Sequence, residues 1–228
     1  MKKIIILAIA IMGITNLQAQ QMATPSISVE GEGTIKVVPD QVLIKVRVES
    51  EGNSAQKVKA DNDAAIDKVL KYTKSMKIND KDVKTEYINL NKNYDYQTKE
   101  YKYVANQSIS ILLKDLSKYA EFTQGLLNAG INRIDGVTFK SNKIDELNSQ
   151  ARIAAIKDAK EKANEYAAAI GQSIGKAINI SESGSIAPPQ PIYRMEMMKA
   201  SDSGSAENTI AIGEMVVKAT INASFELK

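Results

Sequence analysis

Residues 88–111 read INLNKNYDYQTKEYKYVANQSISI, and their pattern decides the fold class. Apolar and polar side chains alternate along both halves with a period of two, which is typical of half-buried strands. A turn centred on residues 98 and 99 predicts a long antiparallel hairpin. Its predicted facing pairs are Tyr96 with Tyr101, Tyr94 with Tyr103, and Ile88 with Ile109. All these side chains would then lie on one face, with aromatic residues at the hairpin tip and aliphatic residues at its base.

A second hairpin is predicted near the N-terminus. Apolar residues occupy the odd positions of residues 27–37 and the even positions of residues 42–48. A tight connection at residues 38–41 would pair these two strands and bring both apolar sets onto one face. Gly31 and Gly33 in the first strand indicate either a bulge or a place where another element approaches closely.

Apolar residues at helical spacing predict helices over residues 53–76, 115–129 and 142–170. Asn53 with Gln56 resembles a capping box at the start of the first. Gly130 follows the second as a C-terminal stop signal. In the third helix alanine recurs at every fourth residue over 151–167, and such a ridge of small side chains lets a helix lie close to its neighbour.

Further strands are predicted over residues 131–139, 176–181 and 215–225, with Ile134 and Val137 of the first facing inward. The predicted order is two strands, a helix, two strands, a helix, a strand, a helix and two strands. Hairpins mixed with helices indicate an α+β fold, in which a mainly antiparallel sheet built from hairpins is covered by helices on one face.

The composition excludes most familiar catalytic and metal sites. The chain has 228 residues, with 30 Lys and Arg against 27 Asp and Glu, and contains neither His nor Cys. Histidine is the commonest general base and metal ligand, and cysteine supplies thiolate nucleophiles and zinc ligands. We therefore expect a protein that is not an enzyme and holds no cofactor.

The first nineteen residues have the layout of a secretory signal peptide. Lys2 and Lys3 precede an apolar run over residues 4–14, and a short polar stretch ends at Ala19. The apolar run is shorter than the roughly 20 residues that cross a bilayer. Cleavage after Ala19 would leave residues 20–228 as one α+β domain without a transmembrane helix, with 28 basic and 27 acidic side chains. Such a near-neutral chain does not predict nucleic-acid binding.

The stretch over residues 183–208 is rich in Ser, Gly, Pro and Met, shows no period, and is predicted to be a flexible insertion. Met195, Met197 and Met198 within it offer thioethers to Cu(I), a metal that prefers sulfur ligands. Alternatively, these methionines hold the insertion on an apolar groove, since methionine suits adaptable surfaces. A small-molecule or copper-binding module is therefore the alternative function.

Two other motifs favour structural interpretations. Residues 171–175 match the GxSxG pattern of a hydrolase, but that site needs a strand before the serine, a helix after it and a histidine. Here a helix precedes and a strand follows, so Gly171 is interpreted as a helix stop. Asp61, Asp63 and Asp67 lack the glycine and ligand spacing of a calcium loop, which favours a solvated charged face.

The tyrosines at the predicted hairpin tip are the candidate site; they are Tyr94, Tyr96, Tyr101 and Tyr103. Aromatic residues on a strand serve as core, as interface anchors or as stacking platforms for a ligand or lipid. A hairpin tip extends beyond the body of a domain, where core burial is harder to arrange. Our leading hypothesis is a self-associating protein in which these rings join subunits.

Taken together, the residues resemble the SIMPL domain family, of the bacterial 26 kDa periplasmic or outer-membrane antigen type. The matching features are the signal peptide, Ile27-Ser-Val-Glu-Gly-Glu-Gly-Thr with Pro39-Asp40, Lys84-Thr85, the tyrosine hairpin closing at Asn106, Asp115-Leu116, Asn128-Ala-Gly130, Gly136, Phe139 and the alanine-rich helix. The resemblance implies an α+β fold, export to the periplasm or outer membrane through a cleaved signal peptide, and peripheral association with the envelope. It also implies homo-oligomers and a role linked to envelope or oxidative stress, and it supplies no catalytic residues.

Overall fold

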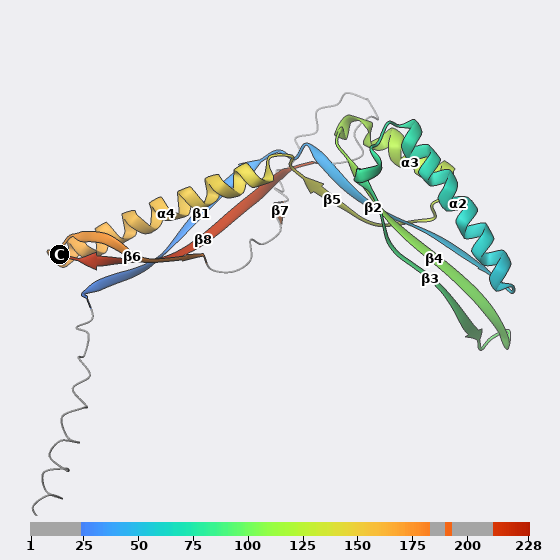
Figure 1. Ribbon diagram of the computed structural model, residues 1–228, viewed down its shortest axis with the longest axis horizontal. Helices are drawn as coiled ribbons and strands as arrows, with labels where there is room; N and C mark the ends of the chain where they lie inside the picture. Colours follow the sequence, from blue (N-terminus) through green and yellow to red (C-terminus); the bar gives the residue numbers. More distant parts are fainter. Residues whose placement is uncertain (1–23, 183–189, 193–211) are drawn as a thin grey trace, which may run out of the picture.

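The computed structural model describes residues 24–182, 190–192 and 212–228. In this part of the chain the strands form two four-stranded antiparallel sheets, each with helices on one face (Figure 1). The predicted α+β class with mainly antiparallel sheets and helical cover on one face is confirmed. The predicted signal peptide over residues 1–19 lies outside the described residues.

The first sheet and its helices form the central lobe, at the right of Figure 1. Its elements are β2 (Gln41–Gly52), α2 (Ala55–Ser75), the 3-10 turn η1 (Asp80–Asp82), β3 (Val83–Asp95), β4 (Glu100–Leu113), the 3-10 turn η2 (Leu116–Lys118), α3 (Tyr119–Ala129) and β5 (Arg133–Lys140). The strand order is β3-β4-β2-β5. Its core lies between the β2–β4 face and the helices, around fully buried Ile44, Ile111 and Phe122.

The second sheet belongs to the terminal lobe, which contains the first and last strands of the chain (Figure 1). Its elements are β1 (Ser26–Val37), α4 (Ile144–Ala169), β6 (Ile174–Glu182), β7 (Gln190–Ile192) and β8 (Glu214–Leu227). Strand β8 lies between β1 and β6, and β7 also pairs with β8. This lobe has a separate core beneath α4, so the described residues build two cores rather than one.

The predicted hairpin between β1 and β2 is wrong. Strand β1 pairs along its whole length with β8, from Ser26 opposite Glu226 to Val37 opposite Met215. Strand β2 lies between β4 and β5 in the other sheet. The alternation of apolar residues determines which face of a strand is buried but not which strand lies beside it, and both arrangements bury the same faces.

Two connections join the lobes, and hydrogen bonds of Asp40 link one connection to the other. The Asp40 backbone N–H donates to the carbonyl of Lys140 at 3.1 Å, and its carboxylate accepts a hydrogen bond from the Asn142 N–H at 2.8 Å. Residues 38–40 follow β1, and residues 141–143 precede α4. These bonds hold the two crossing segments side by side where the sheets separate.

The glycines of β1 mark a close approach, as the sequence indicates. A Cβ built on Gly31 would lie 2.1 Å from the carbonyl oxygen of Ala155, and one on Gly33 would lie 2.0 Å from that of Ala151. The alanines that recur every fourth residue of α4 are fully buried against the sheet. Glycine on the strand and alanine on the helix therefore let the two backbones almost touch.

The helix ends follow their sequence signals with one correction. The N-cap of α2 is Ser54 rather than Asn53, and its hydroxyl accepts a hydrogen bond from the Lys57 N–H at 3.5 Å. Gly130 ends α3 with φ 118°. Gly171 follows α4 with φ 72°, which agrees with its interpretation as a helix stop. Left-handed backbone of this kind suits glycine because it has no Cβ.

The prediction that Ile134 and Val137 lie inside is right about their face and wrong about their burial, because both lie on the core side, opposite the buried Val46 and Ile44. These side chains of β5 are 44% and 38% exposed. Strand β5 forms an edge of the central sheet, and its pairing with β2 shifts register between Lys45 and Val46. The apolar pattern of a strand does not reveal that it lies at an edge, where helical cover ends.

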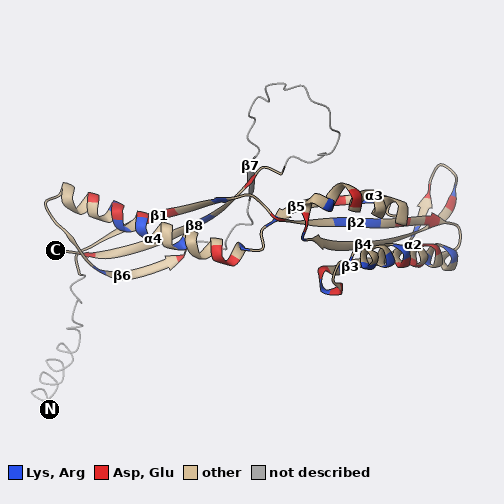
Figure 2. Cartoon of the chain, turned by 90° about the horizontal axis from the view of Figure 1, so that it is seen from above, with Lys and Arg blue, Asp and Glu red and all other residues tan. Residues whose placement is uncertain are grey.

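The exposed faces of α2 and α4 carry charges of both signs (Figure 2). On α2 three pairs join residues four apart, namely Lys57 with Asp61, Lys59 with Asp63, and Lys71 with Asp67. Such pairs stabilise a helix by a few tenths of a kcal/mol, about 0.2–0.5 each. The predicted solvated charged face is confirmed for these aspartates.

Candidate interaction surface on the β3–β4 hairpin

Strand β3 is an edge strand, and the helices of the described residues leave most of it uncovered. Helix α2 packs mainly on β2 and β4, and every residue from Lys84 to Tyr94 is exposed. On the side that faces the core in the neighbouring strands, Ile88 is 67% exposed and Leu90 is 42% exposed. The hairpin therefore presents apolar side chains on the face that is buried elsewhere in the sheet.

The predicted β3–β4 hairpin is confirmed, but its register differs by two residues. Tyr94 faces Tyr101, Lys92 faces Tyr103, and Ile88 faces Gln107. The carboxylate of Asp95 accepts hydrogen bonds from the N–H groups of Gln97 and Thr98, at 2.9 and 3.2 Å, so the turn closes one residue earlier than predicted. A shift of two residues keeps each side chain on its original face, which is why the predicted face is nevertheless right.

The hydrogen bonds in this turn also affect acidity. The N–H groups of Thr98 and then Gln97 hold the pKa of the Asp95 carboxyl below its usual value, because they stabilise the charged form. Lys99 completes the turn with φ 56°, a left-handed conformation. The turn is thus fixed by local bonds, and it determines where the neighbouring tyrosines lie.

Three of the four predicted tyrosines gather at the tip. The Tyr94 ring lies 5.0 Å from Tyr101 and 5.1 Å from Tyr96, between ring centroids. The Lys92 ammonium lies 4.0 Å from the centroid of the Tyr101 ring. Tyr103 is half-buried and lies farther from the tip, 5.9 Å from the same ammonium. Tyr94, Tyr96 and Tyr101 therefore form the exposed cluster, and Tyr103 does not belong to it.

The hairpin tip extends past the rest of the sheet. Strand β2 ends at Gly52, which lies opposite Tyr103. Tyr96 is 85% exposed and Tyr101 is 55% exposed, beyond that end. We call the exposed apolar set the hairpin stripe; it consists of Ile88, Leu90, Tyr94, Tyr96 and Tyr101.

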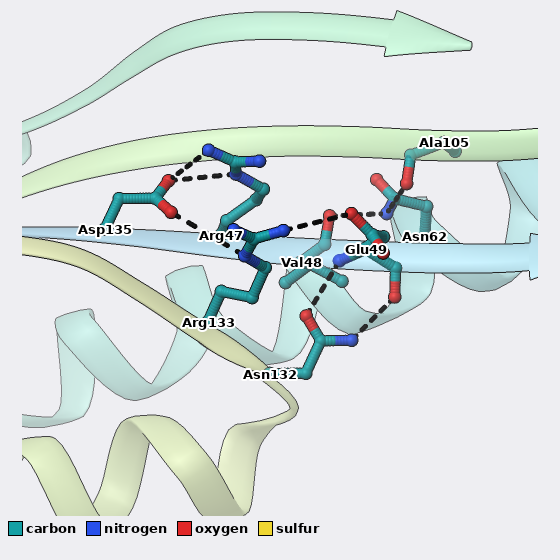
Figure 3. A network of polar contacts seen from close by, with 8 residues as sticks. All are labelled: Arg47, Val48, Glu49, Asn62, Ala105, Asn132, Arg133 and Asp135. Carbon is teal, nitrogen blue, oxygen red and sulfur yellow. Dashed lines mark hydrogen bonds and ion pairs between the residues drawn. The ribbon is translucent and has the colours of Figure 1, made fainter. Parts of the chain in front are cut away.

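The opposite face of the central sheet carries a polar network (Figure 3). Arg47 donates from Nε to the carboxylate of Asp135 at 2.9 Å, and Arg133 lies 3.8 Å from the same carboxylate and 3.7 Å from that of Glu49. Asn132 accepts from the Glu49 N–H at 2.9 Å and donates to the Glu49 carbonyl at 2.6 Å. These contacts connect β5 and the segment before it to β2. We therefore assign this polar network a structural role.

A second polar contact lies on the same face, between β3 and β4. The hydroxyl of Ser110 donates to the carboxylate of Glu86 at 2.7 Å. This hydrogen bond, followed by the nearby charge of Lys84, lowers the pKa of the Glu86 carboxyl. It lies where the register of β3 against β4 shifts, between Thr85 and Tyr87, and fastens the irregular part of the hairpin.

Comparison with known proteins identifies the family. The model of SIMPL, described as a protein of unknown function (DUF541), matches residues 27–225. The chain belongs to the SIMPL family. It is similar to the 26 kDa periplasmic immunogenic protein of Brucella melitensis, with 27% identity over 224 residues, 92% of this chain and 89% of that protein.

A second relative is the uncharacterized protein YggE of Escherichia coli. It is 27% identical over 233 residues, which cover 99% of this chain and 94% of YggE. YggE of Edwardsiella ictaluri is 25% identical over 205 residues, 86% of this chain and 85% of that protein. The predicted family resemblance is thus confirmed over nearly the whole chain.

The remaining candidates of this SIMPL chain have different outcomes. Met195, Met197 and Met198 lie outside the described residues, so copper binding there stays a prediction. In the described ranges, no group of three or more Asp or Glu side chains gathers as a metal site would require. Ser173 exchanges two backbone hydrogen bonds with Lys228, at 2.9 and 2.8 Å. None of the helices in those ranges is long and apolar enough to cross a bilayer.

The exposure of Ile88 and Leu90 was not predicted. The same strand nevertheless carries a signal for it, because Asn89, Asn91 and Asn93 alternate with the apolar residues. Asparagine is depleted in strands, and charged residues on the apolar side, such as Lys92, are typical of strands at a sheet edge. These polar residues could have identified β3 as an edge strand.

Proposed function

We propose that this protein is exported to the periplasm or outer membrane as residues 20–228, after cleavage of a signal peptide, and works without catalysis as a self-associating envelope protein. The hairpin stripe, which joins subunits, carries the proposal. The names of the Brucella relatives, which describe a periplasmic protein, support the location. The proposed link to envelope or oxidative stress rests on the family resemblance alone.

The first support is the exposed apolar surface of the stripe. Tyr94, Tyr96 and Tyr101 are 40%, 85% and 55% exposed, together almost two full rings. With about 200 Å² for a buried tyrosine, this leaves roughly 350 Å² that a partner can cover. At about 25 cal/mol per Å², burial contributes several kcal/mol before the entropy cost of association.

The second support is the free edge of β3. Within the described residues the outer edge of β3 has no neighbouring strand, so its backbone N–H and C=O groups are open to pairing. Three rings alone cover less than the roughly 800 Å² that each partner buries in a stable interface. Ile88, Leu90 and the open edge enlarge the available surface along the same hairpin.

The composition supports a role by surface contact rather than by catalysis. The chain lacks His and Cys, so proton transfer near neutral pH and thiolate chemistry have no ordinary side chain to use. The amphipathic tyrosine ring is enriched at interfaces because it combines apolar area with a hydroxyl that stays solvated.

The test is the mass of the mature protein in solution. In the parent we expect an oligomer, and in the double variant Tyr94→Ser, Tyr101→Ser we expect dissociation to a smaller species by light scattering and sedimentation. The matched control is Tyr166→Ser, since Tyr166 is 56% exposed on α4 and outside the stripe. A monomeric parent, or equal masses for parent and double variant with unchanged circular dichroism, contradicts the proposal.

A further inference from the structure

A cavity opens at the end of the central lobe opposite the tyrosine tip. It lies where α2 ends and β4 leaves the sheet, beside η1 and η2, and has a volume of about 270 Å³. A smaller hollow of about 180 Å³ adjoins it and shares Met76, Lys77 and Lys118. The larger hollow lies just below the range of roughly 300–1,000 Å³ that ligand pockets occupy, so it suits only a small ligand.

The wall of the cavity combines an apolar part with cations. Met76, Ile78 and Leu113 supply the apolar part, and Leu113 is buried while the other two are half-buried. Three lysines, Lys77, Lys114 and Lys118, also line it, together with the carboxylates of Asp82 and Asp115, and Glu121 lines the adjoining hollow. Each of the two lining aspartates pairs with one of the lysines, which leaves one lysine to attract a negative head group whose short apolar body lies against the apolar part.

The lysines differ in how far their charge is already compensated. The Lys114 ammonium lies 2.5 Å from the carboxylate of Asp82, and the Lys118 ammonium lies 3.9 Å from that of Asp115. In the part of the chain that the structure describes, Lys77 has no carboxylate within ion-pair distance. Lys77 is therefore the cation most available to a ligand.

The backbone conformation of Lys77 is a second reason to assign the ligand contact to this residue. Lys77 follows the last residue of α2 and its cap Met76, and has φ 59°, in the left-handed region. The other two described α-helices place glycine in this conformation at their ends, Gly130 after α3 and Gly171 after α4. A lysine there costs folding free energy that glycine would avoid, and strain of this kind clusters at functional sites.

We propose that this cavity binds a small organic anion, a carboxylate or phosphate with a short aliphatic body, and that Lys77 binds its head group. The apolar body lies against Met76, Ile78 and Leu113. The site is separate from the hairpin stripe and does not depend on self-association.

Three probes separate the parts of the ligand. Hexanoate carries both head and body, inorganic phosphate carries only an anionic head, and 1-hexanol carries only the body. The readout is the methyl NMR signal of Met76, assigned by loss of the signal in Met76→Leu and observable in large assemblies. We expect hexanoate to shift this signal in a saturable way at a concentration at least about five-fold lower than either single-feature probe.

The decisive variant is Lys77→Gly. Because glycine suits the left-handed backbone, this variant should melt at or above the parent temperature, so weaker binding cannot be attributed to unfolding. We expect its dissociation constant for hexanoate to rise about three- to ten-fold, the loss typical of a partly exposed charged contact. The matched control is Lys81→Ala, a lysine of η1 that does not line the cavity and should bind as the parent does.

Several outcomes overturn the proposal. If hexanoate leaves the Met76 signal unchanged, the cavity does not bind it. If 1-hexanol shifts the signal at the same concentration as hexanoate, the charge of the head group plays no part in binding. Equal affinity of Lys77→Gly and the parent removes the role assigned to Lys77. All these results are independent of the masses measured for the tyrosine variants, so failure here is distinguishable from failure of the proposed function.

Discussion

Replacing Gly33 with alanine should disrupt the packing of α4 on its sheet. The added Cβ would lie 2.0 Å from the carbonyl oxygen of Ala151 and 2.6 Å from the backbone nitrogen of Ala155. Ordinary contacts of a Cβ begin at 3.4 Å. The obstructing atoms belong to a helix backbone and cannot rotate away, so α4 has to move outward by about 1 Å.

The loss of unfolding free energy can be estimated from the packing contacts that this movement loosens. The alanine ridge of α4 is fully buried at all five of its positions, from Ala151 to Ala167. A gap of about 0.5–1 Å already forfeits a quarter to a half of the dispersion energy of each contact. Overpacking usually costs about 1–3 kcal/mol, and the rigid neighbours place Gly33→Ala at about 3 kcal/mol or more. For a chain of this size that corresponds to a melting temperature roughly 6–12 °C lower.

The assay is thermal and urea unfolding of the mature protein, followed by far-ultraviolet circular dichroism. Gly136→Ala is the matched control because nothing lies within 4 Å of a Cβ built at Gly136, in the edge strand β5. It should change the stability by less than about 0.5 kcal/mol. If Gly33→Ala melts within a degree of Gly136→Ala, the close approach of helix and strand is not real.

Two further changes test the polar contacts. Asn62→Leu removes a buried amide that donates to the Val48 carbonyl at 3.0 Å, and should lower the unfolding free energy by about 1–3 kcal/mol in urea titrations; an unchanged midpoint would show that the bond contributes nothing. Asp158 accepts hydrogen bonds from Lys162 and from the Glu32 N–H, which lower its pKa below the ordinary 3.8. A carboxyl whose pKa is lower in the folded state than in the unfolded state stabilises the fold at any pH above its unfolded-state pKa. This stabilisation is lost as the pH falls through the folded-state pKa. Asp158→Asn should therefore be less stable than the parent at neutral pH, with a difference that shrinks below about pH 4; a constant difference down to pH 2 would contradict this.

Much of the local structure could be predicted from short-range patterns. Apolar residues at helical spacing predicted α2, α3 and α4, and glycines marked the ends of the last two. The turn between β3 and β4 and its tyrosines were also predictable, because turn chemistry and alternation act within a few residues. The hairpin register was missed by two residues, since such a shift leaves every side chain on its original face.

The exposed sites were harder to predict. Ile88 and Ile134 alternate with polar residues just as core residues do, but both belong to edge strands that helices leave uncovered. The cavity near Lys77 brings together the end of α2 and the end of β4, which are over thirty residues apart in the chain. A short-range sequence pattern does not predict that two such distant segments come into contact.

The amino-acid sequence by itself therefore determined the helices and the long strands, the apolar face of each of these strands, and the close contact prepared by Gly31, Gly33 and the alanine ridge. It did not predict the short strand β7, which lies within the stretch expected to be a flexible insertion. Only the tertiary structure decided that β1 pairs with β8 instead of β2, and hence that the part of the chain the structure describes forms two sheets with two cores. The physical reason is that alternation specifies which side of a strand avoids water. The choice of a neighbouring strand depends on the packing of helices and strands far apart in the chain.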